Sequence, residues 1–322
     1  MVVTQENRIW KFLKNQAIVL AMIAVFAVFS MLNPQFYSSN NIILILRQVS
    51  IVAVMGCGMC FVIIGGNFDL SVGSLLTLCC MICISLHDII GPIPAMLVTI
   101  VIGILSGCLT GFLVGYLRLN SMIVTLGMMN VLQAIALMYS GGQYARLNDP
   151  DAWFTQIGKG SVGPVPVVVI IMVITIAVFT ILLNKTIYGE YVLSVGSNAE
   201  ACRFSGINDK KVILLTYVLS GFTTAIGAIM LCSRGGAAEL RLGVGYEFDV
   251  ITGVILGGAS LNGGSGSIPK TFIGVLIIGI LKNGFVIISL PYYLQWIAQC
   301  LIILVAVWLD IRSKRKKGVL AS

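Results

Sequence analysis

The sequence predicts an all-α polytopic membrane protein with about ten transmembrane helices, some of them discontinuous, and with both termini in the cytoplasm. The first observation behind this prediction is composition: of the 322 residues, 58% are hydrophobic and only 10% are charged. An ordinary soluble domain carries about 45–50% apolar and roughly 25% charged residues. Twelve acidic and twenty basic residues cannot cover the surface of a globule this large. A soluble enzyme and a disordered chain are therefore excluded.

The second observation is the run of apolar segments, because a helix needs about 20 apolar residues to cross the hydrocarbon layer of a bilayer. Two of the segments are short, and an error at 248–261 would change the topology. The bases before the first segment resemble a signal peptide, but no cleavage site follows, so we expect an uncleaved anchor. The predicted spans are 15–32, 42–64, 72–86, 93–117, 121–139, 164–183, 212–232, 248–261, 270–288 and 292–309.

The third observation is the distribution of Lys and Arg, which are in excess on the cytoplasmic side of membrane proteins. Placing the N-terminus in the cytoplasm leaves only four bases outside: Arg146, Lys159, Arg234 and Arg241. Most of the other bases gather at the two tails and in one central loop, without a basic stripe that carries aromatic residues. The net charge of +8 therefore indicates orientation in a membrane rather than nucleic-acid binding.

Several short motifs imitate catalytic sites. Residues 264–271 differ by one residue from the sequence motif of a phosphate-binding loop. Pro269 replaces the second glycine of that motif and removes a backbone N–H donor. Ser265 lies in a protease-like Gly-Gly-Ser-Gly string, and His87, the only histidine, is predicted at the opposite membrane face. The nine cysteines lie mostly in apolar runs and act as small hydrophobes. We therefore expect no catalytic residue, no metal site, no cofactor and no enzyme.

Three segments carry features that a simple helix bundle would not need, and the first is 65–73. Two glycines followed by Asn67, Asp69 and Ser71 predict a break between helices, with Asp69 or Ser71 capping the second one. One interpretation is an ordinary cytoplasmic turn. The other is a discontinuous helix on a substrate path, since an acid within a membrane is costly.

The second segment is the hydrophilic loop 184–211, predicted to lie in the cytoplasm. Residues 197–204 are expected to form a short helix that ends at Gly206. Such a helix suits docking into a groove of another protein, and the alternative is an interfacial helix resting on lipid. The candidate docking face comprises Gly196, Asn198, Glu200, Ala201, Arg203 and Gly206.

The third segment is 243–267, a second glycine-rich break. It echoes the first, because a Gly-Gly pair is followed by a Gly-Ser pair in both: Gly65, Gly66, Gly73, Ser74 and Gly257, Gly258, Gly266, Ser267. Corresponding breaks in two halves of a chain indicate an internally repeated transporter.

In order and spacing these segments resemble the permease subunit of bacterial ABC importers for simple sugars, of the ribose/xylose/galactose type. The resemblance covers roughly 40–310, with departures at Asn67, which replaces a glycine, and at Pro269-Lys270. The matching positions are Gly66 to Gly73; Tyr188, Gly189, Val195, Gly196, Asn198, Ala201, Ser205, Gly206 and Ile207; and Gly243 through Ser267.

The resemblance implies a single permease domain over 1–322, in the bacterial plasma membrane, that moves a monosaccharide or related small polar solute. It also implies an ABC ATPase subunit, an extracytoplasmic substrate-binding protein and a second permease copy or paralogue as partners. The loop 184–211 would couple the ATPase to the permease.

Polar residues on the predicted spans are candidates for the translocation path, although helix packing explains each of them as well. A different mechanistic class is an ion-coupled secondary transporter that uses Asp69. Such a carrier usually needs several buried ionisable groups, and besides Asp69 the predicted spans offer only Lys282 and Arg47. A structural scaffold is a third class. The path candidates are Asn67, Asp69, Ser71, Asn130, Gln133 and Asn283, followed by Gln295 and Trp296.

Overall fold

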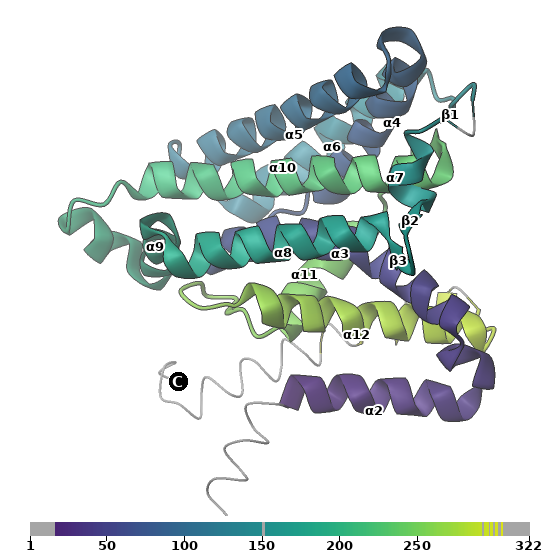
Figure 1. The fold of residues 1–322 in the computed structure, drawn as a ribbon. Helices are drawn as coiled ribbons and strands as arrows, with labels where there is room; N and C mark the ends of the chain where they lie inside the picture. The colour runs from purple at the N-terminus through teal and green to yellow at the C-terminus, as the bar shows by residue number, and fades with distance from the viewer. Residues whose placement is uncertain are drawn as a thin grey trace, which may run out of the picture.

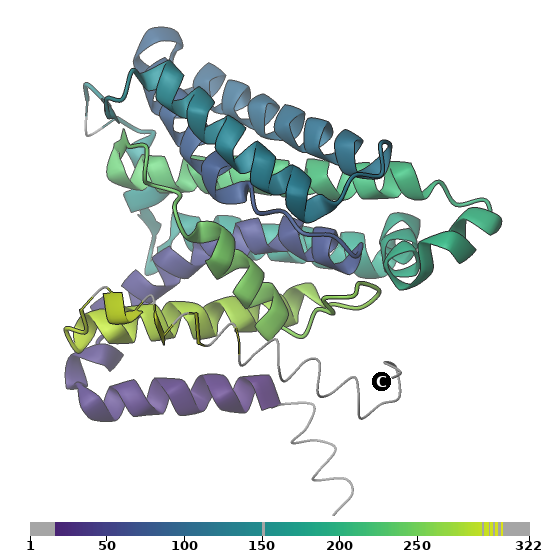
Figure 2. The same cartoon turned by 180° about the vertical axis from the view of Figure 1, so that it is seen from behind.

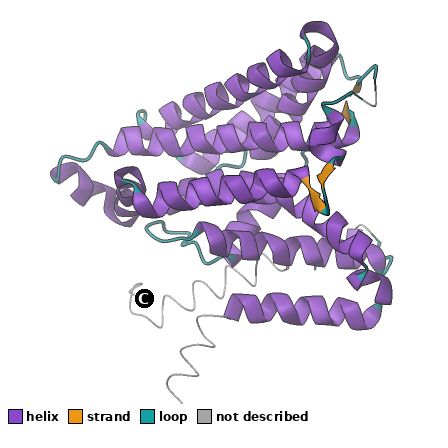
Figure 3. Ribbon diagram, in the orientation of Figure 1, coloured by secondary structure: helices purple, strands orange, loops and turns teal. Residues whose placement is uncertain are grey.

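The computed structural model describes residues 17–149 and 152–291, together with 293–295, 297, 298, 300, 301 and 304. The described chain is almost entirely helical (Figures 1 and 3). The N-terminal and C-terminal bases, Trp296 and most of the predicted span 292–309 lie outside the described residues.

The helices and strands follow one another without a separate domain. The order is α2 (Ala17–Leu32), η1 (Pro34–Tyr37), α3 (Ser39–Ile64), α4 (Val72–Ile90), α5 (Pro92–Gly115), α6 (Ser121–Ser140), β1 (Ala145–Arg146), α7 (Thr155–Lys159), β2 (Ser161–Val162), β3 (Val165–Pro166), α8 (Val167–Lys185), α9 (Ile187–Phe204), α10 (Asp209–Gly235), β4 (Ala237–Ala238), α11 (Tyr246–Leu256) and α12 (Ile268–Ile287).

Seven helices among the described residues are long and apolar enough to cross a membrane, namely α3, α4, α5, α6, α8, α10 and α12. Each coincides with a predicted span, and α4 proves longer than the sequence suggested. Pro269 stands in the first turn of α12, where a missing N–H costs no helical hydrogen bond.

The predicted span 248–261 is wrong as a spanning helix. The helix found there, α11, has 11 residues, which give about 16 Å against about 30 Å of hydrocarbon. It begins after Gly245, whose φ of 91° is left-handed. Residues 239–245 before it form turns that connect β4 to α11. The glycines that break this segment explain why it is a short helix preceded by non-helical chain.

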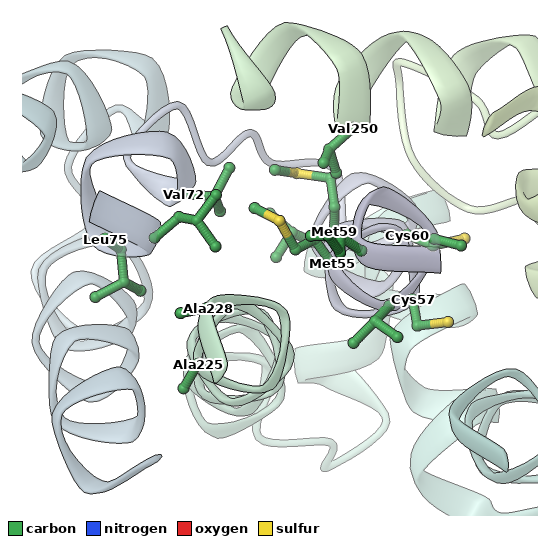
Figure 4. Close-up of a cluster of buried hydrophobic side chains, with 14 of the residues drawn as sticks. Met55, Cys57, Met59, Cys60, Val72, Leu75, Ala225, Ala228 and Val250 are labelled. Atoms are coloured by element: carbon green, nitrogen blue, oxygen red, sulfur yellow. The ribbon is translucent and has the colours of Figure 1, made fainter. Parts of the chain in front are cut away.

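The core lies between α3, α4 and α10, the three most buried long helices. Figure 4 shows Met55 and Met59 reaching from α3 toward Val72 of α4, with the small side chains of Ala225 and Ala228 on the facing side of α10. The flexible Met55 side chain packs against Gly227 of α10, where a Cβ would lie 3.0 Å from its Cγ.

A glycine stripe on α5 allows α10 to approach closely. Gly103, Gly107, Gly111 and Gly115 recur every four residues and therefore share one helix face. A Cβ at Gly107 would overlap the carbonyl oxygen of Tyr217 on α10. Small residues at this spacing are a known basis of tight packing between membrane helices, where lipid supplies no hydrophobic drive.

The bundle has two distinct ends (Figure 1). One end carries α9, and the opposite end carries α7 and two small antiparallel pairs, β1 with β4 and β2 with β3. Arg47 lies at this second end, where its Nη1 donates to the Gly158 carbonyl oxygen at 2.8 Å. The expectation that Arg47 is an interior charge is therefore wrong.

Candidate functional site

The three unusual segments of the sequence meet at the α9 end of the bundle. The Gly264 N–H donates to the Ile64 carbonyl oxygen at 2.8 Å, which joins the third segment to the first. Gly196 of the second segment lies against both, because a Cβ there would overlap the Ile64 oxygen and crowd the Gly264 nitrogen. Gly263 in turn packs on Gly66 and Gly196. We call this contact of Gly66, Gly196, Gly263 and Gly264 the glycine junction.

A helix in each of the three segments ends in the same way. Gly66, Gly206 and Gly258 have left-handed φ angles of 79°, 82° and 85°. Each N–H bonds the carbonyl three residues back, and the next N–H bonds the carbonyl five residues back. These are the two hydrogen bonds of a Schellman motif, which requires φ > 0 and therefore favours glycine. The echo between the first and third segments thus corresponds to one backbone geometry.

The short helix predicted in the second segment is present as the last part of α9. Asn198 interrupts α9 with φ −160° and ψ 92°, and its Oδ1 accepts the Ala201 N–H at 2.9 Å. Asn198 is therefore the N-cap of a helical turn that runs to Phe204. The preceding residues, from Ile187, are also helical, which the sequence reading did not include.

The predicted docking residues are largely accessible on this turn. Asn198, Glu200, Ala201, Arg203 and Gly206 are exposed, whereas Gly196 is half-buried in the glycine junction. The sequence reading missed Phe204, which lies 85% exposed at the end of the turn. An aromatic side chain this exposed is typical of an interaction anchor, and its position beside Gly206 was the signal available in the sequence.

A charge cluster fixes the turn to the rest of the bundle. Asp209, 2% exposed at the start of α10, accepts Arg118 Nη2 at 2.9 Å on Oδ1 and lies 3.2 Å from Arg203 Nε through Oδ2. Although Arg203 is exposed, it therefore also forms an ion pair within the chain. Nearby, burial raises the pKa of the Tyr188 hydroxyl, which donates to the Val212 carbonyl at 3.4 Å and so stays neutral.

The break at 65–71 is held by buried hydrogen bonds. Asp69 Oδ1 accepts the Ser71 N–H at 3.0 Å and its hydroxyl at 2.6 Å, while Oδ2 accepts Ser220 Oγ of α10 at 2.9 Å. Tyr217 Oη donates to the Phe68 carbonyl at 2.8 Å. Ser71 stands at the N-cap of α4 but makes no side-chain cap hydrogen bond, because its hydroxyl donates to Asp69. Asp69 attaches the break to α10, and Asn67 donates to Gly65 O within the turn.

A cavity of about 520 Å³ lies between α3, α10, α11 and α12, and we call it the ionic cavity. Its lining includes Asp249 and Lys282, whose Oδ2 and Nζ are 2.5 Å apart, and Arg234. Asn283 also lines it, but its amide pairs reciprocally with Asn41 at 2.9 Å. Gln295 is the remaining predicted path residue here.

Removing the ammonium group that contacts Asp249 is expected to destabilise the α11–α12 contact. Lys282→Met should lower the free energy of unfolding by about 1–3 kcal/mol, because Asp249 is 4% exposed and loses a charge-assisted hydrogen bond. Thermal unfolding in detergent measures this. The double variant Asp249→Asn/Lys282→Met should recover most of the loss, and equal instability of the single and double variants would contradict the pairing.

A second cavity, of about 190 Å³, lies between α4, α6 and the start of α11. Asn130, Gln133, Ser74 and Glu247 bring polar groups to its wall, and we call it the acceptor cavity. Of the predicted path residues, Asn130 and Gln133 therefore share one cavity, and Asn283 lines the other. Among the described residues, Asn67, Asp69 and Ser71 line neither.

The sequence reading missed the two acids at the start of α11 as interior charges. Glu247 is 8% exposed and Asp249 is 4% exposed, so the expectation that only Lys282 and Arg47 accompany Asp69 is wrong. Both acids stand in the Gly-Tyr-Glu-Phe-Asp string of the third segment: Glu247 directly precedes the short predicted span 248–261, and Asp249 lies inside it. That coincidence was the available signal. Figure 2 shows α11, in green, tilted between α6 and α12, so the two acids can face different cavities.

Comparison with known proteins gives a consistent result. Residues 41–307 match the family model described as "Branched-chain amino acid transport system / permease component". The chain is 39% identical to "Ribose import permease protein RbsC" of Haemophilus influenzae, over 98% of both chains. It is 37% identical to the protein of the same name in Bacillus subtilis, over 93% of this chain and 92% of the relative.

A further relative is "L-arabinose ABC transporter permease protein AraH" of Azospirillum brasilense, 31% identical over 94% of this chain and 89% of the relative. No solved structure matches the chain. The resemblance to sugar ABC permeases is confirmed, and with its seven apolar helices the chain is a multi-pass protein of the bacterial inner membrane. Because the match covers most of its length, this chain belongs to the family of ABC-importer permease components that includes the ribose and L-arabinose permeases.

Proposed function

We propose that this chain is the transmembrane subunit of an ATP-binding-cassette importer that translocates a monosaccharide or related small polar solute. The observation that carries the proposal is the exposed turn 199–204, which stands directly on the glycine junction. A force applied to this turn reaches the ends of α3 and α11 through backbone contacts, without a flexible linker. The names of the relatives, ribose and L-arabinose permeases, support the class of cargo.

Because this chain would form the membrane pathway and other subunits would supply ATP hydrolysis and solute capture, the proposed function implies three partners. A separate ABC ATPase would bind Asn198, Glu200, Ala201 and Phe204 on the turn, with Gly196 and Gly206 setting its geometry. A binding protein would deliver the solute at the α7 end, and a second permease copy or paralogue would complete the path. The whole of 1–322 would then form one permease domain in lipid, with 184–211 as its coupling loop.

We further propose an N-in, C-in topology of ten crossings. The seven long helices, α2, the segment 237–256 that includes α11, and the predicted span 292–309 would make up the ten. The α9 end would be cytoplasmic, because Arg118, Lys185, Lys210 and Lys270 lie at the ends of helices that meet there.

Two substitutions on the turn test the coupling role. Glu200→Lys reverses a charge on its exposed face, and Gly206→Pro imposes a φ near −65° where the chain has 82°. Both are expected to reduce sugar uptake at least tenfold and to abolish stimulation of the ATPase by the binding protein, measured in proteoliposomes that hold the full complex. Val173→Ala, on the exposed apolar side of α8 between the two ends of the bundle, is the control and should leave both activities unchanged.

If both variants kept sugar uptake and stimulated ATPase activity, the turn 199–204 would not be the docking site of the ATPase. An ion-coupled carrier is less well supported, since the Asp69 carboxylate oxygens already accept three hydrogen bonds from Ser71 and Ser220. Uptake that an uncoupler abolishes while ATP depletion does not would instead favour that class.

A further inference from the structure

We propose that the acceptor cavity, with Asn130, Gln133 and Glu247, is the contact site for the cargo inside the membrane, and that it selects neutral polyhydroxylated solutes over anionic ones. The inference rests on the proposed function and adds to it the residues that meet the solute and the chemistry that they recognise.

The cavity lies near the middle of the bilayer. Asn130 is nine residues into α6, which spans Ser121–Ser140, and this places it about 14 Å along a helix that must cover about 30 Å. Glu247 belongs to the first turn of α11, the helix that starts within the bundle after the 239–245 turns. A half-length helix that begins at membrane depth leaves room for polar groups that a continuous span would exclude.

The polar groups of the cavity both accept and donate hydrogen bonds, and the Glu247 carboxylate adds acceptors. Asn130 Nδ2 donates to the Leu126 carbonyl at 3.0 Å, and Gln133 Nε2 donates to the Leu240 carbonyl at 2.8 Å. Each amide keeps its carbonyl oxygen as an acceptor and one N–H as a donor, and Ser74 adds a hydroxyl. Glu247 Oε1 accepts the Gly245 N–H at 3.3 Å, and its carboxylate has further acceptor capacity. Hydroxyl groups are the donors that such a wall pairs with, and a carboxylate repels an anion at this depth.

The position of the Glu247 carboxylate depends on two glycines. A Cβ at Gly73 would overlap Glu247 Oε2, and a Cβ at Gly243 would overlap the Gly73 carbonyl oxygen. Thr77 Oγ1 accepts the Gly243 N–H at 3.0 Å and fixes this crossing. The backbones of α4 and the segment before α11 therefore approach each other closely at the place where the acid is held.

The exposure of Asn130 supports an aqueous environment for this face of α6. Asn130 is exposed in a mostly apolar helix, and an amide facing hydrocarbon would be costly. The ionic cavity on the other side of α11 is a poorer match for a neutral solute, because Asp249, Lys282 and Arg234 line it with charges, two of which pair with each other.

Uptake by the full complex in proteoliposomes tests the contact, with radiolabelled D-ribose and L-arabinose as probes. Glu247→Gln and Asn130→Leu are expected to reduce the maximal rate at least tenfold while the ATPase stays responsive to the binding protein. The concentration for half-maximal uptake should change little, because the binding protein captures the sugar. Val173→Ala, on the exposed apolar side of α8 and outside both cavities, is the control. Maximal rates within twofold of the unsubstituted protein in both variants would overturn the proposal.

Accessibility of position 130 gives an independent measurement. Cys108→Ser and Cys300→Ser remove the two cysteines that are not buried, and Asn130→Cys or Val173→Cys is then added. A cationic methanethiosulfonate should modify Asn130→Cys at least tenfold faster than Val173→Cys, which lies exposed on the apolar α8. If Asn130→Cys were modified as slowly as Val173→Cys, position 130 would face lipid and the proposal would be wrong, whether or not the uptake variants fold.

The two proposals fail differently. If the unsubstituted complex takes up no sugar, the proposed function fails and the cargo assignment fails with it, even when Asn130→Cys reacts fast. If the complex takes up sugar but the cavity variants do so normally, only the cargo assignment fails.

Discussion

Replacing Gly107 with leucine is expected to separate α5 from α10 and to destabilise the whole bundle. A Cβ at this position already overlaps the backbone carbonyl of Tyr217, so the neighbour cannot move aside by changing a rotamer. Overpacking that side chains absorb costs about 1–3 kcal/mol, and a backbone clash should exceed that range. The measurement is thermal unfolding in detergent, together with the amount of protein inserted in the membrane.

Gly127→Ala provides the matched control for this prediction. Gly127 is also a glycine inside a long apolar helix, but a Cβ there meets nothing within 4 Å. An alanine should be neutral or should stabilise α6 by roughly 0.5–1 kcal/mol. A Gly107→Leu protein as stable as Gly127→Ala would show that the glycine stripe does not set the distance between α5 and α10.

Gly196→Val is expected to abolish uptake with a smaller loss of stability. The new side chain would push α9 away from Ile64 and Gly264 and would open the glycine junction, through which we propose that the ATPase acts. Because α9 lies at one end of the bundle (Figure 1), the core of α3, α4 and α10 should stay folded. Sugar uptake and stimulated ATPase activity in proteoliposomes, with thermal unfolding alongside, measure the difference.

Ser194→Val is the control here, since Ser194 is exposed on the same helix two residues earlier. It adds the same side chain outside the junction and should retain uptake. Normal transport by Gly196→Val would mean that motion passes to the spans by another route.

The positions of the helices could be predicted from the sequence because each apolar run is long and its ends carry local signals. Asn120 caps α6 through its own side chain, and Gly206 ends the turn of α9 with a left-handed φ. Such signals act over a few residues, so a linear reading detects them. The short helix at 197–204 was predicted for the same reason, and the structure places its helical turn at 199–204 after the non-helical Asn198.

The contents of the candidate site could not be predicted in the same way. Glu247 and Asp249 stand two residues apart, and only the direction of α11 places one by the acceptor cavity and the other by the ionic cavity. Asp69 was expected on the path, but Ser220, 151 residues away, takes one of its oxygens. Pairings over such distances depend on the packing of whole helices.

The sequence by itself determined that this protein lies in a membrane, where its seven long apolar helices lie among the described residues, and which three segments are unusual. Hydropathy, turn residues and caps are local properties that follow from composition and short-range sterics. Only the tertiary structure decided that those three segments touch at four glycines, that α11 is a half-length helix, and that its acids line two cavities. The contact of the four glycines arises because backbone atoms distant in the chain can approach each other where no side chain separates them, and the cavities follow from how whole helices pack.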